Sequence, residues 1–224
     1  MSELAAIHPV RLKIDFVSDV VCPWCVIGLN SLEQAMQRLG DAVQCDVTLR
    51  AFELNPHMAR EGQDIAEHLR EKYGSTPEQS AQARDMIRQR GADQGFTFNM
   101  QKRDRIYNSF DAHRLLHWAA SEHKQLELKH ALFVAYFSEG RNISDHAVLL
   151  DIIQSVGLNR ERASAILSSD EYAAEVRAEE QHFVGMGIHA VPSAIINDRY
   201  LIQGGQPTEA FIQALKNISQ EATA

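Results

Sequence analysis

The sequence predicts a mixed α/β fold in which a long helical segment interrupts a small domain built on a sheet. Residues 12–17 and 43–52 alternate apolar and polar side chains, as half-buried strands do, and a helical pattern lies between them. From about residue 60 to residue 186 the apolar spacing is helical and no strand-like run interrupts it. The chain ends with two short β-branched runs and an amphipathic helix, at residues 193–197, 200–202 and 207–218.

Composition limits both the size of the fold and its partners. At 224 residues and 45% hydrophobic content, the chain can bury the core of one large domain, or of a small domain with an insertion. The net charge of −8 leaves no basic patch, so we expect no nucleic-acid partner. No apolar run approaches membrane-spanning length, and residues 1–9 lack the charged and apolar regions of a secretory signal. We therefore expect a cytoplasmic protein without a membrane partner.

The first structural unit is a strand, a helix and a second strand. The first strand pattern ends at Ser18, and apolar residues then recur at near-helical spacing from Trp24 until Gly40 stops them. Pro23 suits the first helical position, where no amide donor is needed. A strand–helix–strand unit of this kind normally pairs its strands in parallel through a right-handed crossover.

Two cysteines, Cys22 and Cys25, stand three positions apart at the start of that helix. Unpaired N–H groups and the helix dipole favour an anion at Cys22, which lowers a thiol pKa and produces the reactive thiolate. Cys25 lies one turn further on the same side, within reach of Cys22. Because cytoplasmic thiols are mostly kept reduced, a vicinal pair there is more often catalytic than structural. The pair therefore predicts a redox-active dithiol.

Two alternatives to a redox dithiol are a zinc site and a pair of inert, buried cysteines. The third cysteine, Cys45, has no nearby Cys or His to complete a tetrahedral zinc site, and its place in the second strand indicates a small apolar filler. His113 and His117 share a helix face at a metal-ligand spacing, but the sequence offers no third ligand, so we expect no metal. Inert packing stays an alternative, but it leaves the Pro-Trp pair at the helix start unexplained.

Start and stop signals divide the central segment into several helices. Thr76 provides an N-cap before a proline at the first helical position, and Asp145 caps another helix. Helices are expected at residues 63–73, 77–93, 108–122, 126–139, 145–155, 159–167 and 170–185. Joining the strands from both ends of the chain into one sheet gives three parts. The sheet domain occupies residues 10–55 and 187–220, and the helical insertion occupies residues 56–186.

With Val191-Pro192 placed before the terminal hairpin, this order of elements resembles a thioredoxin fold. The long helical insertion makes the chain similar to the DsbA family of thiol–disulfide oxidoreductases. Within that family, three motifs resemble the FrnE-like branch: residues 18–25 (Ser-Asp-Val-Val-Cys-Pro-Trp-Cys), 108–115 (Asn-Ser-Phe-Asp-Ala-His-Arg-Leu) and 203–206 (Gln-Gly-Gly-Gln). The resemblance extends over nearly the whole chain, from about residue 11 to residue 218.

The resemblance implies a role for each residue around the dithiol. Cys22 would be the nucleophile, and Cys25 would resolve the mixed disulfide that Cys22 forms with the substrate. Pro192 would follow a cis peptide bond and face the two thiols. Val191 would then offer its backbone to an extended substrate chain, as an added strand.

Three further residues are expected to contact the substrate. Trp24, between the two reactive cysteines, indicates a hydrophobic contact for substrates, with Pro23 beside it. His113 is expected near Cys22, in the lining of the cleft, because the insertion should cover the redox helix.

The sequence therefore predicts a thiol–disulfide oxidoreductase that exchanges disulfides through a Cys-Pro-Trp-Cys dithiol. Its substrates would be disulfide-containing proteins or small thiols. It would use no cofactor beyond the redox-active disulfide, with glutathione as a reductant or co-substrate. The chain also resembles glutathione-dependent 2-hydroxychromene-2-carboxylate isomerases and kappa-class glutathione transferases, which usually carry serine in place of Cys22. A non-catalytic binding module is the third hypothesis, and the insertion offers room for a homodimer face.

Overall fold

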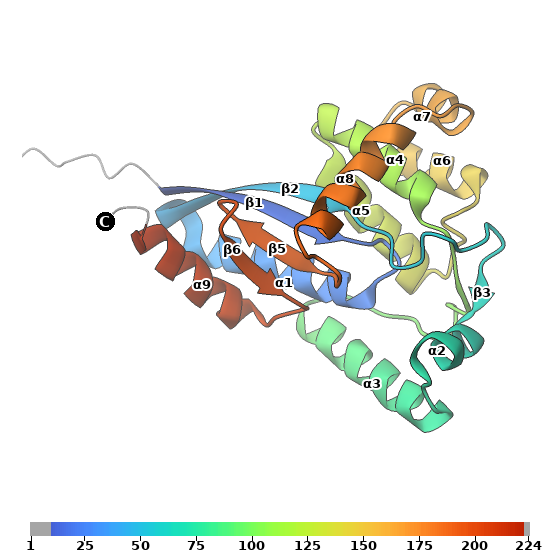
Figure 1. Ribbon diagram of the computed structural model, residues 1–224, viewed down its shortest axis with the longest axis horizontal. Coiled ribbons are helices and arrows are strands. Elements are labelled where there is room, and N and C mark those ends of the chain that lie inside the picture. Colours follow the sequence, from blue (N-terminus) through green and yellow to red (C-terminus); the bar gives the residue numbers. More distant parts are fainter. Residues whose placement is uncertain (1–9, 222–224) are drawn as a thin grey trace, which may run out of the picture.

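The computed structural model describes residues 10–221 and contains a four-stranded sheet in the order β2-β1-β5-β6. β1 pairs in parallel with β2 and antiparallel with β5, which forms a hairpin with β6. The strands are β1 (Val10–Ser18), β2 (Val43–Ala51), β5 (Ser193–Ile196) and β6 (Tyr200–Gln203). Strands from the two ends of the chain therefore meet in one mixed sheet, as the sequence predicted (Figure 1).

Helices cover both faces of this sheet. α1 (Pro23–Leu39) and α9 (Thr208–Glu221) pack side by side on one face, and α8 (Ala173–Gly185) lies over the other (Figure 1). Alternation along β1 supplies both layers with apolar side chains. Phe16 belongs to the main core with α1 and α9, whereas the next residue, Val17, belongs to a second cluster with α8.

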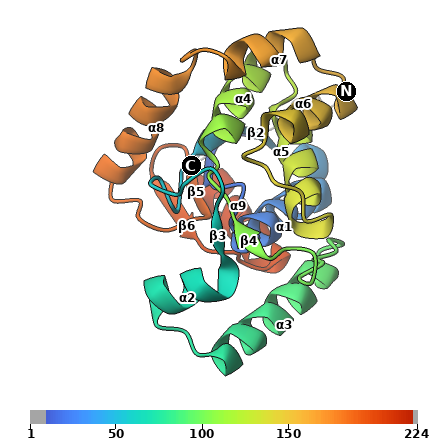
Figure 2. The same cartoon turned by 90° about the vertical axis from the view of Figure 1, so that its right-hand side faces the viewer.

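The segment between β2 and β5 is mostly helical and forms two groups on either side of α1 (Figure 2). One group consists of α2 (Ile65–Tyr73) and α3 (Pro77–Asp93). The other contains α8 with α4 (Phe110–Ser121), α5 (Gln125–Phe133), α6 (His146–Ser155) and α7 (Arg160–Leu167). A 3-10 turn joins α1 to β2 at Gly40–Ala42, and a π-helical turn extends α5 at Val134–Ser138.

Two short strands inside this segment contradict the prediction that strands are absent there. β3 (Gln63–Asp64) and β4 (Arg105–Ile106) pair in an antiparallel ladder. Two residues are too few to show an alternation of apolar and polar side chains, so periodicity cannot detect such strands. The predicted helix starts are confirmed, since the side chains of Thr76 and Asp145 accept hydrogen bonds from the first turns of α3 and α6.

The main core runs from the sheet into the helical segment without a break. Phe16 and Ile27 of the sheet domain and Leu132 and Phe137 of the helical segment belong to a single cluster of buried side chains. Among the helices that the structure describes, none is both long enough and apolar enough to cross a membrane. The first nine residues, in which the sequence showed no secretory signal, lie outside the described part.

Candidate active site

The two cysteines lie where β1 passes into α1. Cys22 is the N-cap residue, with an extended backbone, and Pro23 is the first residue of the helix. The Cys25 amide donates to the Cys22 carbonyl at 3.1 Å, so the first turn brings the two residues together. Both cysteines are free, and the Cys25 thiol shares a hydrogen bond with Cys22.

The environments of the two thiols differ. Cys22 is 3% exposed and forms part of the wall of a cavity, whereas Cys25 is fully buried. Burial raises the pKa of the Cys25 thiol well above its ordinary value, and its interactions with Cys22 raise this pKa further. Of the two cysteines, Cys22 lines the cavity and Cys25 does not. Cys25 can reach Cys22 but not a molecule in the cavity.

A loop from the far end of the chain contacts Cys22. The Val191–Pro192 peptide bond is cis, and the Cys22 thiol donates to the Val191 carbonyl oxygen at 3.6 Å. Gly28 of α1 allows this approach, because a Cβ atom at that position would lie 2.8 Å from Pro192 Cγ. Gly28 was not among the site residues predicted from the sequence. A glycine in the interior of a predicted helix was the available signal.

The cavity beside Cys22 has a volume of about 570 Å³ and lies between the dithiol, α2, α3 and the segment leading to β4. Its size falls in the range of small-molecule sites. Its walls are mainly apolar and aromatic, and they include Val21, Pro23, Trp24, Leu54, Ile65, Leu69, Tyr73, Ile87, Met100 and Ile106. Arg84 and Arg103 add positive charge to these walls. Asp64 and Asp104 also line the cavity and balance these charges, so its walls suit a small, mainly apolar group.

Trp24 lies on the wall of this cavity, and Arg90 and Gly205 contact its indole ring. The Arg90 guanidinium stands 5.8 Å from the centre of the Trp24 ring and donates to the Gly205 carbonyl at 2.7 Å. Gly205 itself lies against the indole, since a Cβ atom there would be 3.1 Å from Trp24 Cε3. Arg90 and Gly205 thus fix the orientation of the indole.

His113 does not lie on this cavity, so the expectation that it contacts the substrate is not met. It is 2% exposed on α4, and its Nε2 lies 3.4 Å from Oδ1 of the fully buried Asp19. Asp19 also accepts hydrogen bonds from the amides of Val21 and Leu54. Burial raises the pKa of Asp19, but the hydrogen bond and charge of His113 and the Leu54 amide outweigh this effect and lower it. Asp19 is therefore a carboxylate that fixes the turn before Cys22.

Sequence reasoning also missed Lys129. This lysine of α5 is 1% exposed, and its ammonium donates to the Ser18 carbonyl at 3.5 Å. Burial lowers the pKa of Lys129 to about 8, against the opposing effect of the negative charges of Cys25, Asp19 and Cys22. A lysine within the apolar stripe of a predicted helix was the signal for it.

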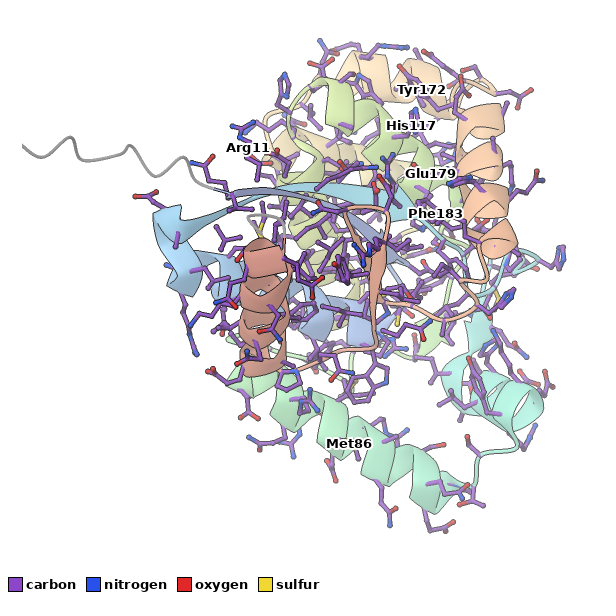
Figure 3. The ribbon with its side chains drawn as sticks, turned by 60° about the vertical axis from the view of Figure 1, so that its left-hand side comes forward. Arg11, Met86, His117, Tyr172, Glu179 and Phe183 are labelled. Carbon is purple, nitrogen blue, oxygen red and sulfur yellow. The ribbon has the colours of Figure 1, made fainter. Side chains whose placement is uncertain are left out.

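The remaining cysteine and histidine predicted from the sequence lie apart from the dithiol. Cys45 is half-buried in β2, and burial together with the charge of Asp46 raises its pKa to about 11. His117 packs against the Tyr172 ring, with 5.2 Å between ring centres (Figure 3). Within residues 10–221, no three His, Cys, Asp or Glu side chains gather as they would around a metal ion.

Comparisons with known proteins agree with this geometry. A probable DsbA oxidoreductase from Streptomyces coelicolor is 32% identical and covers 92% of this chain and 89% of its own, with a TM-score of 0.87. A 2-hydroxychromene-2-carboxylate isomerase shares the fold at 13% identity, with a TM-score of 0.72 over 94% of this chain and 98% of that one. The cytosolic disulfide reductase DsbM from Pseudomonas aeruginosa, in a structure with GSH, shares it at 18% identity. Its TM-score is 0.64 over 93% of this chain and 99% of that one. A family model described as the DSBA-like thioredoxin domain matches residues 13–216, and the chain belongs to that family.

Proposed function

We propose that the protein is a thiol–disulfide oxidoreductase that cycles Cys22 and Cys25 between a dithiol and a disulfide. The observation that carries this proposal is the asymmetry of the pair. Cys22 sits at a helix N-terminus on the wall of a cavity, and Cys25 lies fully buried behind it. This arrangement suits a nucleophile that meets the substrate and a second thiol that meets only the nucleophile.

The reaction proceeds in two exchanges. The Cys22 thiolate attacks one sulfur of a substrate disulfide, and the other sulfur leaves as a thiolate. Cys25 then loses its proton and attacks the Cys22 sulfur, which forms the Cys22–Cys25 disulfide and releases the second substrate thiolate. The substrate gains two electrons and the protein loses two. A thiol such as glutathione would return the protein to the dithiol form, and the reverse sequence oxidises a substrate dithiol.

The substrate site is formed by the cavity and the Val191 loop. Trp24 and Pro23 lie on the wall beside Cys22 and offer an apolar contact to the group next to the disulfide. The Val191 carbonyl accepts a hydrogen bond from the Cys22 thiol. It can instead accept one from the backbone of an extended peptide. Both a small disulfide and a disulfide-containing protein therefore fit the proposal. The fold shared with a cytosolic reductase supports glutathione as the reductant and a cytoplasmic location.

A glutathione-dependent isomerase or transferase is the second candidate. The cavity is large enough for a small aromatic substrate, and the fold is shared with a 2-hydroxychromene-2-carboxylate isomerase. In such an enzyme the reacting thiol belongs to glutathione, so no resolving cysteine is required.

Serine variants of the three cysteines distinguish the two candidates. Cys25→Ser should attack an oxidised peptide and then stall as a mixed disulfide that dithiothreitol releases, because nothing remains to resolve it. Cys22→Ser should form no adduct. Cys45→Ser, with its change in β2 away from the cavity, is the matched control and should behave as the wild type. Intact-mass spectrometry under denaturing conditions measures each adduct. A Cys25→Ser protein that forms no adduct but isomerises an aromatic substrate with glutathione would replace the proposal with the second candidate.

A further inference from the structure

His68 is a buried histidine on the wall of the cavity beside Cys22, and the proposed exchange gives it no role. It is 7% exposed and lies on the same side of α2 as the apolar wall residues Ile65 and Leu69. His68 also borders a second, more open pocket of about 490 Å³ that is formed around residues 54–63. We call this the outer pocket. The imidazole therefore stands at the boundary between the cavity and the outer pocket.

Two hydrogen bonds in series fix the tautomer of this imidazole. Gln63 of β3 donates through its Nε2 to the Glu71 carboxylate at 2.7 Å, and its Oε1 lies 2.8 Å from Nδ1 of His68. Because a carboxylate oxygen accepts hydrogen bonds, the amide nitrogen of Gln63 has to face Glu71 and the amide oxygen has to face His68. Nδ1 of His68 therefore carries the proton, and its Nε2 carries a lone pair.

The Nε2 atom of His68 is free to accept a hydrogen bond. Within residues 10–221, no polar group of the protein forms a hydrogen bond with it. Buried polar groups are normally paired, and an unpaired one costs free energy. Burial and the charge of Lys72 lower the pKa of His68 and outweigh the opposing effect of Glu71, so the ring is neutral at pH 7. The lone pair is thus available to a ligand.

The other polar groups of the cavity do not offer the same feature. Asn55 Oδ1 already accepts from Lys72 at 2.7 Å, and the carboxylates of Asp64 and Asp104 are exposed, where water satisfies them. The hydroxyl of the buried Ser80 can donate as well as accept, so it does not select for a donor. The remaining charged and titratable groups on these walls are Cys22, Tyr73, Arg84 and Arg103 in the cavity and His57 in the outer pocket.

We propose that Nε2 of His68 faces the cavity beside Cys22 and accepts a hydrogen bond from the substrate. The preferred substrates are then small disulfides that carry a hydroxyl or amide N–H group at some distance from the sulfur. The inference rests on the proposed function. Nδ1 is turned to Gln63, which borders the outer pocket but not the cavity, so the opposite edge of the ring is left for the cavity.

His68 is thereby a specificity-determining residue. It contacts the far end of the substrate, while the apolar walls hold the chain between that end and the disulfide. It takes no part in the exchange of sulfur bonds. A substrate that lacks the donor leaves the buried nitrogen unpaired, which lowers the affinity for that substrate.

Matched pairs of disulfides test this recognition. Bis(ω-hydroxyalkyl) disulfides of increasing chain length are compared with their methyl ethers, which keep the oxygen but lack the donor. At the chain length that reaches His68, the hydroxyl compound should have a KM about three- to ten-fold lower than its ether, with kcat within about two-fold. His68→Phe should abolish this preference. His182→Phe, which changes an exposed histidine on α8 away from the cavity, is the matched control and should keep it.

Two results of this comparison would overturn the inference. One is the absence of a hydroxyl preference at every chain length. The other is a preference that persists unchanged in His68→Phe. Gln63→Leu, which removes the acceptor of Nδ1, should weaken the preference although His68 itself is retained, because the ring is then free to protonate Nε2 instead.

Nitrogen NMR of histidine-labelled protein tests the tautomer and the contact without turnover. The His68 signals are those that disappear in His68→Phe. Nε2 should be unprotonated at pH 7, and still mainly so at pH 6.5, where an ordinary histidine is half protonated. In a Cys22→Ser/Cys25→Ser protein, which cannot react, the hydroxyl disulfide should shift the Nε2 signal and its ether should not. A proton on Nε2 at pH 7, or a signal that neither compound moves, would overturn the inference. A shift in this protein without any disulfide turnover in the wild type would contradict only the proposed function.

Discussion

Replacing Gly28 with alanine tests whether the contact between α1 and the Pro192 loop supports the site. The added methyl group would lie 2.8 Å from Pro192 Cγ, and a proline ring can move this atom only by changing its pucker. Overpacking of this kind costs about 1–3 kcal/mol of unfolding free energy, whereas replacing a helical glycine regains about 1 kcal/mol. We therefore expect Gly28→Ala to lose about 1 kcal/mol of stability and to displace Val191 from Cys22.

Gly185 provides a matched control for this substitution. It also lies in a helix, but it is exposed, and no atom lies within 4 Å of a Cβ atom built there. Gly185→Ala should gain up to about 1 kcal/mol, since only the conformational effect remains. Urea unfolding measures both free energies, and the reduction of an oxidised peptide measures activity, which should fall several-fold in Gly28→Ala alone. If both variants gained stability and kept full activity, the close contact between Gly28 and Pro192 would not support the site.

Two further substitutions test the buried charges of Glu53 and Arg114. Burial raises the pKa of Glu53 to about 7 from an ordinary 4.5, so the folded protein binds an extra proton between these values and wild-type stability falls as pH rises through that window. Glu53→Gln should remove this fall. The variant should be more stable than the wild type at pH 8 by at most about 3 kcal/mol, and by less at pH 5. Urea unfolding measures both differences, and an equal difference at the two pH values would contradict this expectation. Arg114 is buried, pairs with Asp111 and donates to three backbone carbonyls at the end of α7 and the loop after it, so Arg114→Met should cost roughly 3–5 kcal/mol. A loss below 1 kcal/mol in the same measurement would show that the helical segment does not depend on this side chain.

The sequence predicted those features that depend on local patterns. Pro23 is the first residue of α1, which places Cys22 at its N-terminus, because the preference of proline for this position acts over a few neighbouring residues. The expected helix at residues 77–93 coincides with α3, since a capping box marks its start. The parallel pairing of β1 with β2 followed from the right-handed crossover rule.

The features that the sequence did not predict depend on contacts between distant segments. Lys129 is separated from Ser18 by 111 residues, and only the fold brings its ammonium to the end of β1. His113 was expected on the substrate side because the insertion covers α1, but its helix presents it to Asp19 instead. The contact of Gly28 with Pro192 likewise depends on how the last strands approach α1. Periodicity gives the buried face of a helix but not the identity of the residue opposite it.

In the proposed function, Cys22 and Cys25 form one reversible two-electron couple. The protein would be equilibrated in glutathione buffers of increasing oxidised fraction and quenched in acid. It would then be unfolded and alkylated, and its intact mass measured by mass spectrometry. We expect a single transition in which two alkylation sites disappear together, while Cys45 stays alkylated throughout. The same transition should be present in Cys45→Ser and absent in Cys22→Ser. A protein that keeps all three thiols alkylated at every ratio, or that gains only a glutathione adduct on Cys22, would contradict the account.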